Sequence, residues 1–190
     1  MKFRFIENWK LKIGYSHAKR ERGFTLIELL VVIGILGVLA AALVATIDPF
    51  EQLKKASDAN VKNTTVEYVD ANIRYYTTHN ALPWAVDTSG CGAAAGMSTN
   101  GPTVTVNLSS LTATCLNDLI TDGEIKSAFT SVTGVLSAIV ITGTTNSVTA
   151  CFAPQSKAQR NDIGTKYNAS ATILAGCPNA TLTTCYWCAQ

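Results

Sequence analysis

The feature that most constrains this chain is an apolar stretch of 24 residues, Phe24 to Ile47, interrupted only by two threonines and one acid, Glu28. As a helix it extends about 36 Å, enough to cross a hydrocarbon core of roughly 30 Å. A carboxylate inside a spanning helix costs about 2.5–3.5 kcal/mol on insertion scales. The sequence therefore predicts a membrane helix in which Glu28 has a specific function.

The charges on either side of this stretch differ in sign. Residues 1–23 hold seven lysines and arginines against two acids, a net charge of +5, and residues 24–190 hold eight against eleven, a net charge of −3. Basic residues before a spanning helix remain in the cytoplasm. We therefore expect a cytoplasmic segment 1–23, a single span in the cytoplasmic (inner) membrane and an exported remainder. The negative charge of that remainder argues against nonspecific nucleic-acid binding.

Two simpler interpretations of the apolar stretch are open. It is long enough for a plain membrane anchor, and Ala40-Ala41-Ala42 offers a signal-peptidase-like site for a secretory signal peptide. The stretch is longer than the usual 7–15-residue apolar region of a signal peptide, and 23 residues precede it. Neither interpretation gives Glu28 a function.

The residues around Glu28 form a recognisable motif. Gly23-Phe24-Thr25-Leu26-Ile27-Glu28-Leu29-Leu30 follows a basic run and opens the apolar stretch. It resembles the prepilin cleavage and methylation motif of type IV pilins and their relatives. The resemblance implies cleavage between Gly23 and Phe24 and N-methylation of Phe24. It also implies assembly through Thr25 and Glu28, with Glu28 pairing with the terminal amine of a neighbouring subunit.

The resemblance further implies partners and a location. The partners are a prepilin peptidase, an inner-membrane assembly platform with its ATPase, membrane lipid before assembly, and further copies of the chain packed through residues 24–47. The assembled filament is extracellular or periplasmic. No cofactor is implied.

A second helix is expected beyond the apolar stretch. Asp48-Pro49 is a helix start or kink, because proline lacks an N–H and fits the first turn. Apolar residues then recur at spacings of three and four, until the pattern stops near His79-Asn80. We expect a face made of Val66, Val69, Ile73 and Tyr76 to pack on a globular head, and the lack of a flexible linker favours one helix from residue 24 to residue 80.

The remaining residues predict a small antiparallel sheet. Strands are expected over 103–108, 135–142 and 148–152, with weaker candidates at 167–174 and 182–187. Residues 109–130 have helical character interrupted by Gly123, and Leu82-Pro83-Trp84 is expected to break the preceding helix. The fold class is therefore α+β, and the resemblance implies the ladle shape of pilins, a long helix carrying a sheet.

All six cysteines lie beyond the apolar stretch. An even number of cysteines in an exported head predicts up to three disulfides, and the sequence leaves all 15 pairings open. The six are Cys91, Cys115, Cys151, Cys177, Cys185 and Cys188. The CxxC formed by Cys185 and Cys188 lies near the C-terminus, outside the strand-to-helix context of a redox pair.

Catalysis has little support in this sequence. His79 is the only histidine outside the leader, and a lone histidine at a helix end is usually a polar cap. No second CxxC accompanies the first, as zinc would require. Asp118, Asp122 and Glu124 do not have EF-hand spacing. The sequence predicts neither an enzyme nor a metal site.

The expected organisation is a leader over 1–23 that is removed, a filament-core helix half over 24–47, an amphipathic half over 48–80 and a disulfide-bonded head over 81–190. The expected function is that of a structural subunit of a type IV pilus-like filament, serving adhesion, twitching motility, DNA uptake or secretion. Two alternatives are open. One is a pseudopilin of a type II secretion system, and the other is a membrane-anchored exported binding domain or enzyme.

Overall fold

The computed structural model describes residues 23–46, 48–86, 90–92, 96–98, 100–102 and 105–190. The chain divides into two units, Met1–Ile47 and Asp48–Gln190. The leader that the sequence predicts over 1–23 lies outside the described residues, apart from Gly23.

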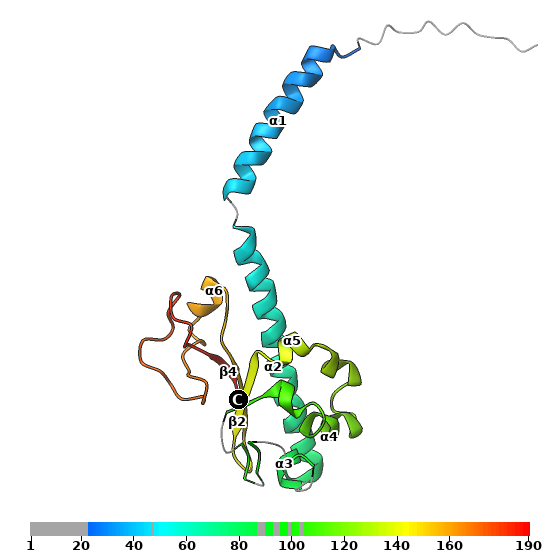
Figure 1. Cartoon of the computed structure of the whole chain (residues 1–190), viewed down its shortest axis with the longest axis vertical. Coiled ribbons are helices and arrows are strands. Elements are labelled where there is room, and N and C mark those ends of the chain that lie inside the picture. The colour runs from blue at the N-terminus through cyan, green and yellow to red at the C-terminus, as the bar shows by residue number, and fades with distance from the viewer. Residues whose placement is uncertain (1–22, 47, 87–89, 93–95, 99, 103–104) are drawn as a thin grey trace, which may run out of the picture. The chain divides into compact units, whose positions relative to one another are not determined.

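The described residues of the first unit form one helix, α1 (Leu26–Thr46; Figure 1). Its 21 residues are all exposed in the structure, including ten leucines, isoleucines and valines between Leu26 and Val38. It is the one helix in the described part of the chain that is long and apolar enough to cross a membrane. An exposed apolar helix of this length requires lipid or other helices around it.

The second unit begins with α2 (Pro49–His79), whose two ends are capped as the sequence predicts. Asp48 accepts hydrogen bonds from Phe50 N and Glu51 N, at 3.1 and 3.3 Å, and Pro49 takes the first helical position. At the other end Asn80 adopts the left-handed conformation, with φ 55°, and donates to Tyr76 O. Because Asp48 is extended, as residues before proline prefer, α1 and α2 are separate helices.

A four-stranded antiparallel sheet packs against α2, which confirms the α+β class. The strand order is β1-β2-β3-β4, and β3 lies along α2 (Figure 1). The strands are β1 (Val106–Asn107), β2 (Ile139–Gly143), β3 (Val148–Phe152) and β4 (Trp187–Ala189). Gly143 is required before the β2–β3 turn, because a Cβ there would collide with the carbonyl oxygen of Ser147.

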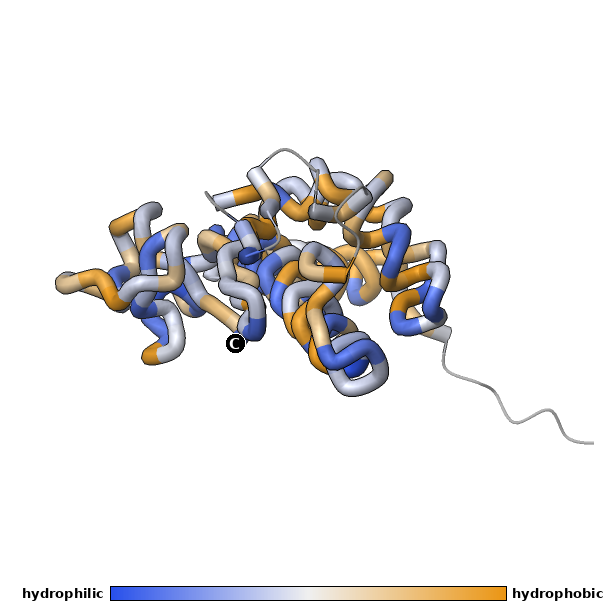
Figure 2. The backbone as a smooth tube through the Cα atoms, turned by 90° about the horizontal axis from the view of Figure 1, so that it is seen from below, coloured by the Kyte–Doolittle hydropathy of each residue, from blue (hydrophilic) through white to orange (hydrophobic). Residues whose placement is uncertain are grey.

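Short helices complete the core around α2 and the sheet. They are α3 (Pro83–Val86), α4 (Cys115–Thr121), α5 (Thr133–Leu136), α6 (Lys157–Arg160) and the 3-10 helices η1 (Leu108–Leu111) and η2 (Ser127–Ser131). Tyr68, Trp84 and Leu116 are among the side chains that they bury completely. Figure 2 shows apolar and polar segments alternating along the backbone, as burial on one side of an element requires.

The structure corrects several predicted elements. Residues 133–136 form α5, so the strand predicted over 135–142 begins only at Ile139. In the strand predicted over 103–108, only Val106 and Asn107 pair, and 103–104 lie outside the described residues. The last strand starts at Trp187, where the prediction ended, and Tyr167 forms only isolated bridges, to Ile173 and Tyr186. Pro83 opens α3 because proline fits a first turn.

The face of α2 that packs on the head also differs from the prediction. Val69 is buried and Tyr76 is half-buried, but Val66 and Ile73 are exposed. The buried face is centred on Tyr68 and includes polar residues whose side chains bond locally. Thr65 Oγ1 donates to Val61 O at 2.7 Å, and Asn72 Nδ2 donates to Tyr68 O at 2.8 Å. A search for apolar spacing misses a buried face that includes such polar residues.

Candidate processing and assembly site

The first turn of α1 is closed by a reciprocal pair of hydrogen bonds between Thr25 and Glu28. Glu28 Oε2 accepts from Thr25 N at 2.8 Å and from Thr25 Oγ1 at 2.8 Å. Thr25 Oγ1 accepts in turn from Glu28 N at 3.2 Å. This is a capping box, which satisfies amide groups that a helix N-terminus leaves without partners.

This local function of Glu28 was not predicted, although its signal is present in the sequence. A threonine followed three residues later by a glutamate, just before an apolar run, is the pattern of a capping box. Glu28 therefore stabilises the start of its own helix. Its second oxygen, Oε1, accepts no hydrogen bond from the residues that the structure describes, so it is open to a donor from outside the chain.

The surroundings of this carboxylate are apolar. Glu28 shares a shallow recess of about 320 Å³ with Phe24, Ile27, Val31 and Val32. If apolar helices cover this recess, water can no longer solvate Oε1. A cation at hydrogen-bond distance would then offset most of the cost of the buried charge.

Two glycines further along α1 lie in open space in the described structure. A Cβ at Gly34 or Gly37 would meet no atom within 4 Å in the described structure, so neither position is restricted by local packing. Small residues on an exposed apolar helix allow close approach of other helices. Their spacing of three does not make a GxxxG motif.

The head carries three disulfides, which confirms that disulfide bonds form and identifies the pairs. These are Cys91–Cys115, Cys151–Cys188 and Cys177–Cys185. The two cysteines of the CxxC bond to different partners, so they do not form a dithiol pair with each other. Cys151–Cys188 joins directly opposite residues of β3 and β4.

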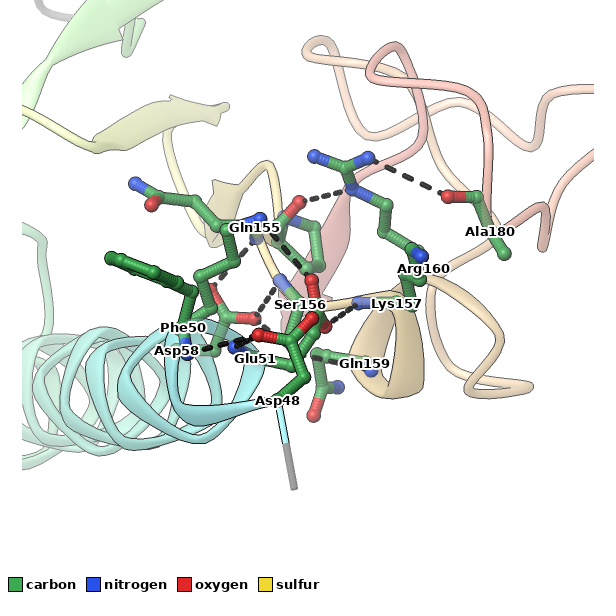
Figure 3. A network of polar contacts seen from close by, with 12 residues as sticks. Asp48, Phe50, Glu51, Asp58, Gln155, Ser156, Lys157, Gln159, Arg160 and Ala180 are labelled. Carbon is green, nitrogen blue, oxygen red and sulfur yellow. Dashed lines mark hydrogen bonds and ion pairs between the residues drawn. The ribbon is translucent and has the colours of Figure 1, made fainter. Parts of the chain in front are cut away.

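The buried carboxylate of Asp58 fastens the 155–160 segment to α2 (Figure 3). Asp58 is 3% exposed and accepts from Gln155 N at 2.8 Å, Ser156 N at 2.8 Å and Ser156 Oγ at 2.6 Å. About two helical turns before Asp58, Glu51 Oε2 accepts from Lys157 N at 3.0 Å. That backbone N–H, followed by the Lys54 ammonium at 3.1 Å, holds the pKa of Glu51 below its ordinary value.

Replacing Asp58 with alanine is expected to lower the free energy of unfolding by about 2–4 kcal/mol, because it leaves the N–H groups of Gln155 and Ser156 without acceptors. Asp58→Asn keeps one acceptor oxygen and should cost less. Denaturant unfolding measures both. The matched control is Asp70→Ala, an exposed acid on the same helix, expected within about 0.5 kcal/mol of the wild type. Equal losses from Asp58→Ala and Asp70→Ala would contradict the assigned function of Asp58.

The head's other candidate side chains make contacts that hold the fold together. His79 ends α2, stacks on Tyr75 at 4.0 Å and lies 3.5 Å from Asp122 Oδ2. Arg74 Nε donates to Glu124 Oε2 at 2.9 Å, and Arg74 Nη2 donates to the carbonyl oxygen of Glu124 at 2.7 Å. Among the described residues no three histidines, cysteines or acids gather as metal ligands would.

These features define a class: an α+β head with three disulfides, preceded by one exposed apolar helix whose first turn is a Thr-x-x-Glu box directly after Gly23-Phe24. A family model described as the prokaryotic N-terminal methylation motif matches residues 18–44. That motif is the prepilin-type signal of type IV pilins and pseudopilins. Residues 18–44 therefore carry the signal that prepilin peptidase recognises in type IV pilins and pseudopilins. A search of curated proteins and a search of solved structures each return no match.

Proposed function

We propose that this chain is a structural subunit of a type IV pilus-like filament. Prepilin peptidase cleaves it between Gly23 and Phe24, and Phe24 is then N-methylated. The motif over residues 18–44 supports this processing. Removal of residues 1–23 frees an amine four residues before Glu28, at the start of a helix whose apolar residues are exposed in the described part of the chain.

The assembly step is supported by the Glu28 carboxylate, of which only one oxygen accepts hydrogen bonds from the described residues. Oε2 belongs to the capping box, whereas Oε1 is free for the methylated amine of a neighbouring subunit. Such a pair forms only in one register of packed helices, because any other register leaves a charge buried without a partner. Thr25 contributes by fixing the carboxylate through two hydrogen bonds.

The proposed organisation follows from this assembly. Residues 24–47 are held in the inner membrane until they pack into the filament core, residues 48–80 support the head, and 81–190 form the exported, disulfide-bonded head. The assembly platform and its ATPase extract the subunit from lipid. Adhesion, twitching motility, DNA uptake and secretion all remain within this proposal.

The proposal is tested by expressing the full chain with a prepilin peptidase and an assembly system, and imaging negatively stained cells and sheared surface material. Filaments that contain the chain are the expected result. If the chain is processed but stays in the membrane, filament formation by this subunit is contradicted. Short filaments only upon overproduction of a type II secretion system would assign it to the pseudopilins instead.

A further inference from the structure

The charges of the second unit are distributed unevenly. Residues 48–63 and 155–167 hold six lysines and arginines against four acids, a net charge of +2, and residues 64–154 hold two against six, a net charge of −4. We call these the basic part and the acidic part. The six cationic residues of the basic part are Lys54, Lys55, Lys62, Lys157, Arg160 and Lys166.

The basic part lies at the end of the unit where α2 begins. Glu51 Oε2 accepts from Lys157 N at 3.0 Å, so α6 is fixed beside the first turns of α2 (Figure 3). The acidic part reaches the other end of α2, because Asp122 Oδ2 lies 3.5 Å from Nε2 of His79. Since α2 is about 46 Å long, the two charges are well separated.

Two lysines of the basic part are available to an anion from outside the chain. Lys55 and Lys157 have exposed side chains and make no ion pair with any residue that the structure describes. The acids of the basic part, in contrast, each accept a hydrogen bond from a backbone N–H. These acids are Asp48, Glu51, Asp58 and Asp162.

Exposed apolar side chains accompany these lysines. Phe50 and Leu53, on the first turns of α2, are 71% and 67% exposed. Side chains of a helix tilt toward its N-terminus, so both point to the end where α2 begins. Lysines together with large exposed apolar side chains are typical of surfaces that lie at a membrane interface, where apolar groups enter the headgroup region and amines meet phosphates.

The position of this surface in the chain favours the membrane as its partner. Phe50 follows the apolar stretch 24–47 by three residues. Lys55 lies about 9 Å along the helix axis from Pro49. The polar layer of one leaflet is about 5–8 Å thick, and charges act over about 8 Å in physiological salt. Lys55 is therefore within reach of lipid phosphates when residues 24–47 span the membrane, and so is Lys157 beside Glu51.

We propose that Lys55 and Lys157, with Phe50 and Leu53, dock the second unit on anionic lipid headgroups of the leaflet that faces the exported part. An anionic surface attracts the basic part and repels the acidic part, so it also orients the unit with the start of α2 toward the membrane. This docking rests on the proposed membrane anchoring and exported head, and it is independent of filament formation.

The lipid selectivity of the full chain, reconstituted in vesicles of phosphatidylcholine and phosphatidylglycerol, tests this contact. Electron paramagnetic resonance measures the association of spin-labelled phosphatidylglycerol relative to phosphatidylcholine. Lys55→Gln/Lys157→Gln is expected to lower the preference for phosphatidylglycerol at least about two-fold, because two cations near the surface are lost. The basic leader is the same in all variants, so differences between them report the second unit.

Two controls accompany this variant. Lys55→Arg/Lys157→Arg keeps both charges and should keep the preference. Lys126→Gln removes an exposed lysine of the acidic part and should also leave the preference unchanged. Thiol labelling without reductant identifies misfolded variants, because a folded variant retains three disulfides.

Each outcome decides the proposal. An unchanged preference in Lys55→Gln/Lys157→Gln, or an equal loss in Lys126→Gln, overturns the contact while leaving the proposed function intact. Loss of the wild-type preference on adding inorganic phosphate or DNA at constant ionic strength assigns the lysines to that anion instead and also overturns it. A wild-type chain that does not insert into the vesicles contradicts the proposed membrane anchoring itself.

Discussion

Glu28→Gln is expected to abolish filament assembly while leaving cleavage after Gly23 intact. Glutamine at this position still accepts from Thr25 and keeps the capping box, but it has no charge for the amine of a neighbouring subunit. Removing one partner of a buried ion pair costs about 3–5 kcal/mol, a factor of about 100 or more in an association constant. The measurement is the ratio of filament to membrane-held subunit, with processing followed by mass.

Two companion variants separate the two functions of Glu28. Thr25→Val removes the hydroxyl of the capping box but keeps the carboxylate charge, and it should weaken assembly far less than Glu28→Gln. Glu28→Leu removes both functions and should behave like Glu28→Gln in assembly. Normal assembly of Glu28→Gln would mean that the residue only caps its own helix, and the proposed pairing between subunits would be wrong.

Loss of the Cys151–Cys188 disulfide is expected to produce the largest change in the stability of the head. The bond closes a 37-residue separation and ties β4, a strand of three residues, to β3. The chain-entropy relation gives about 4 kcal/mol for a loop of this length. A Cys151→Ala/Cys188→Ser variant should lose about that much free energy of unfolding, measured in denaturant with the remaining disulfides oxidised.

The Cys177–Cys185 bond supplies an internal control. It closes a separation of only eight residues, for which the same relation gives about 2.5 kcal/mol. Its double serine variant should therefore be less destabilised than the variant that lacks Cys151–Cys188. The reverse order would contradict loop length as the source of the difference.

Local signals explain which parts of the fold the sequence could predict. The start of α2 at Asp48-Pro49 and its end at His79-Asn80 depend on capping residues that act within a few positions of themselves. The strand Val148–Phe152 was also predicted correctly. Nearly all of its residues are buried, because it lies between β2 and β4 and packs against α2.

Tertiary contacts explain what the sequence could not provide. The buried face of α2 includes Asp58, which is satisfied by a segment almost 100 residues away, so no spacing rule could find it. Residues 135–138 were predicted to belong to the strand that follows them, yet they lie in α5 and in a turn before β2. The disulfide pairs depend on strand register, as Cys151 opposite Cys188 illustrates.

The N-terminal site was predicted by type but not by geometry. Gly23, Phe24, Thr25 and Glu28 were selected by resemblance to a processing motif, and the family comparison supports that motif. The hydrogen bonds between Thr25 and Glu28 were not predicted, because the resemblance implies a partner for the acid in another subunit. The pocket between α2 and α6, lined by Lys62 and Gln159 among others, could not be found from sequence, since its two sides are about 100 residues apart.

The proposed assembly requires a free amine on Phe24, four residues before Glu28. One oxygen of the Glu28 carboxylate accepts hydrogen bonds from Thr25, and the other is open to the amine of a neighbouring subunit. Intact-mass analysis with N-terminal sequencing of the protein from assembled material tests this directly. A chain of residues 24–190 that begins with N-methylated Phe24 is the expected result. A chain that retains residues 1–23, or one that begins near Ala42, would contradict the account.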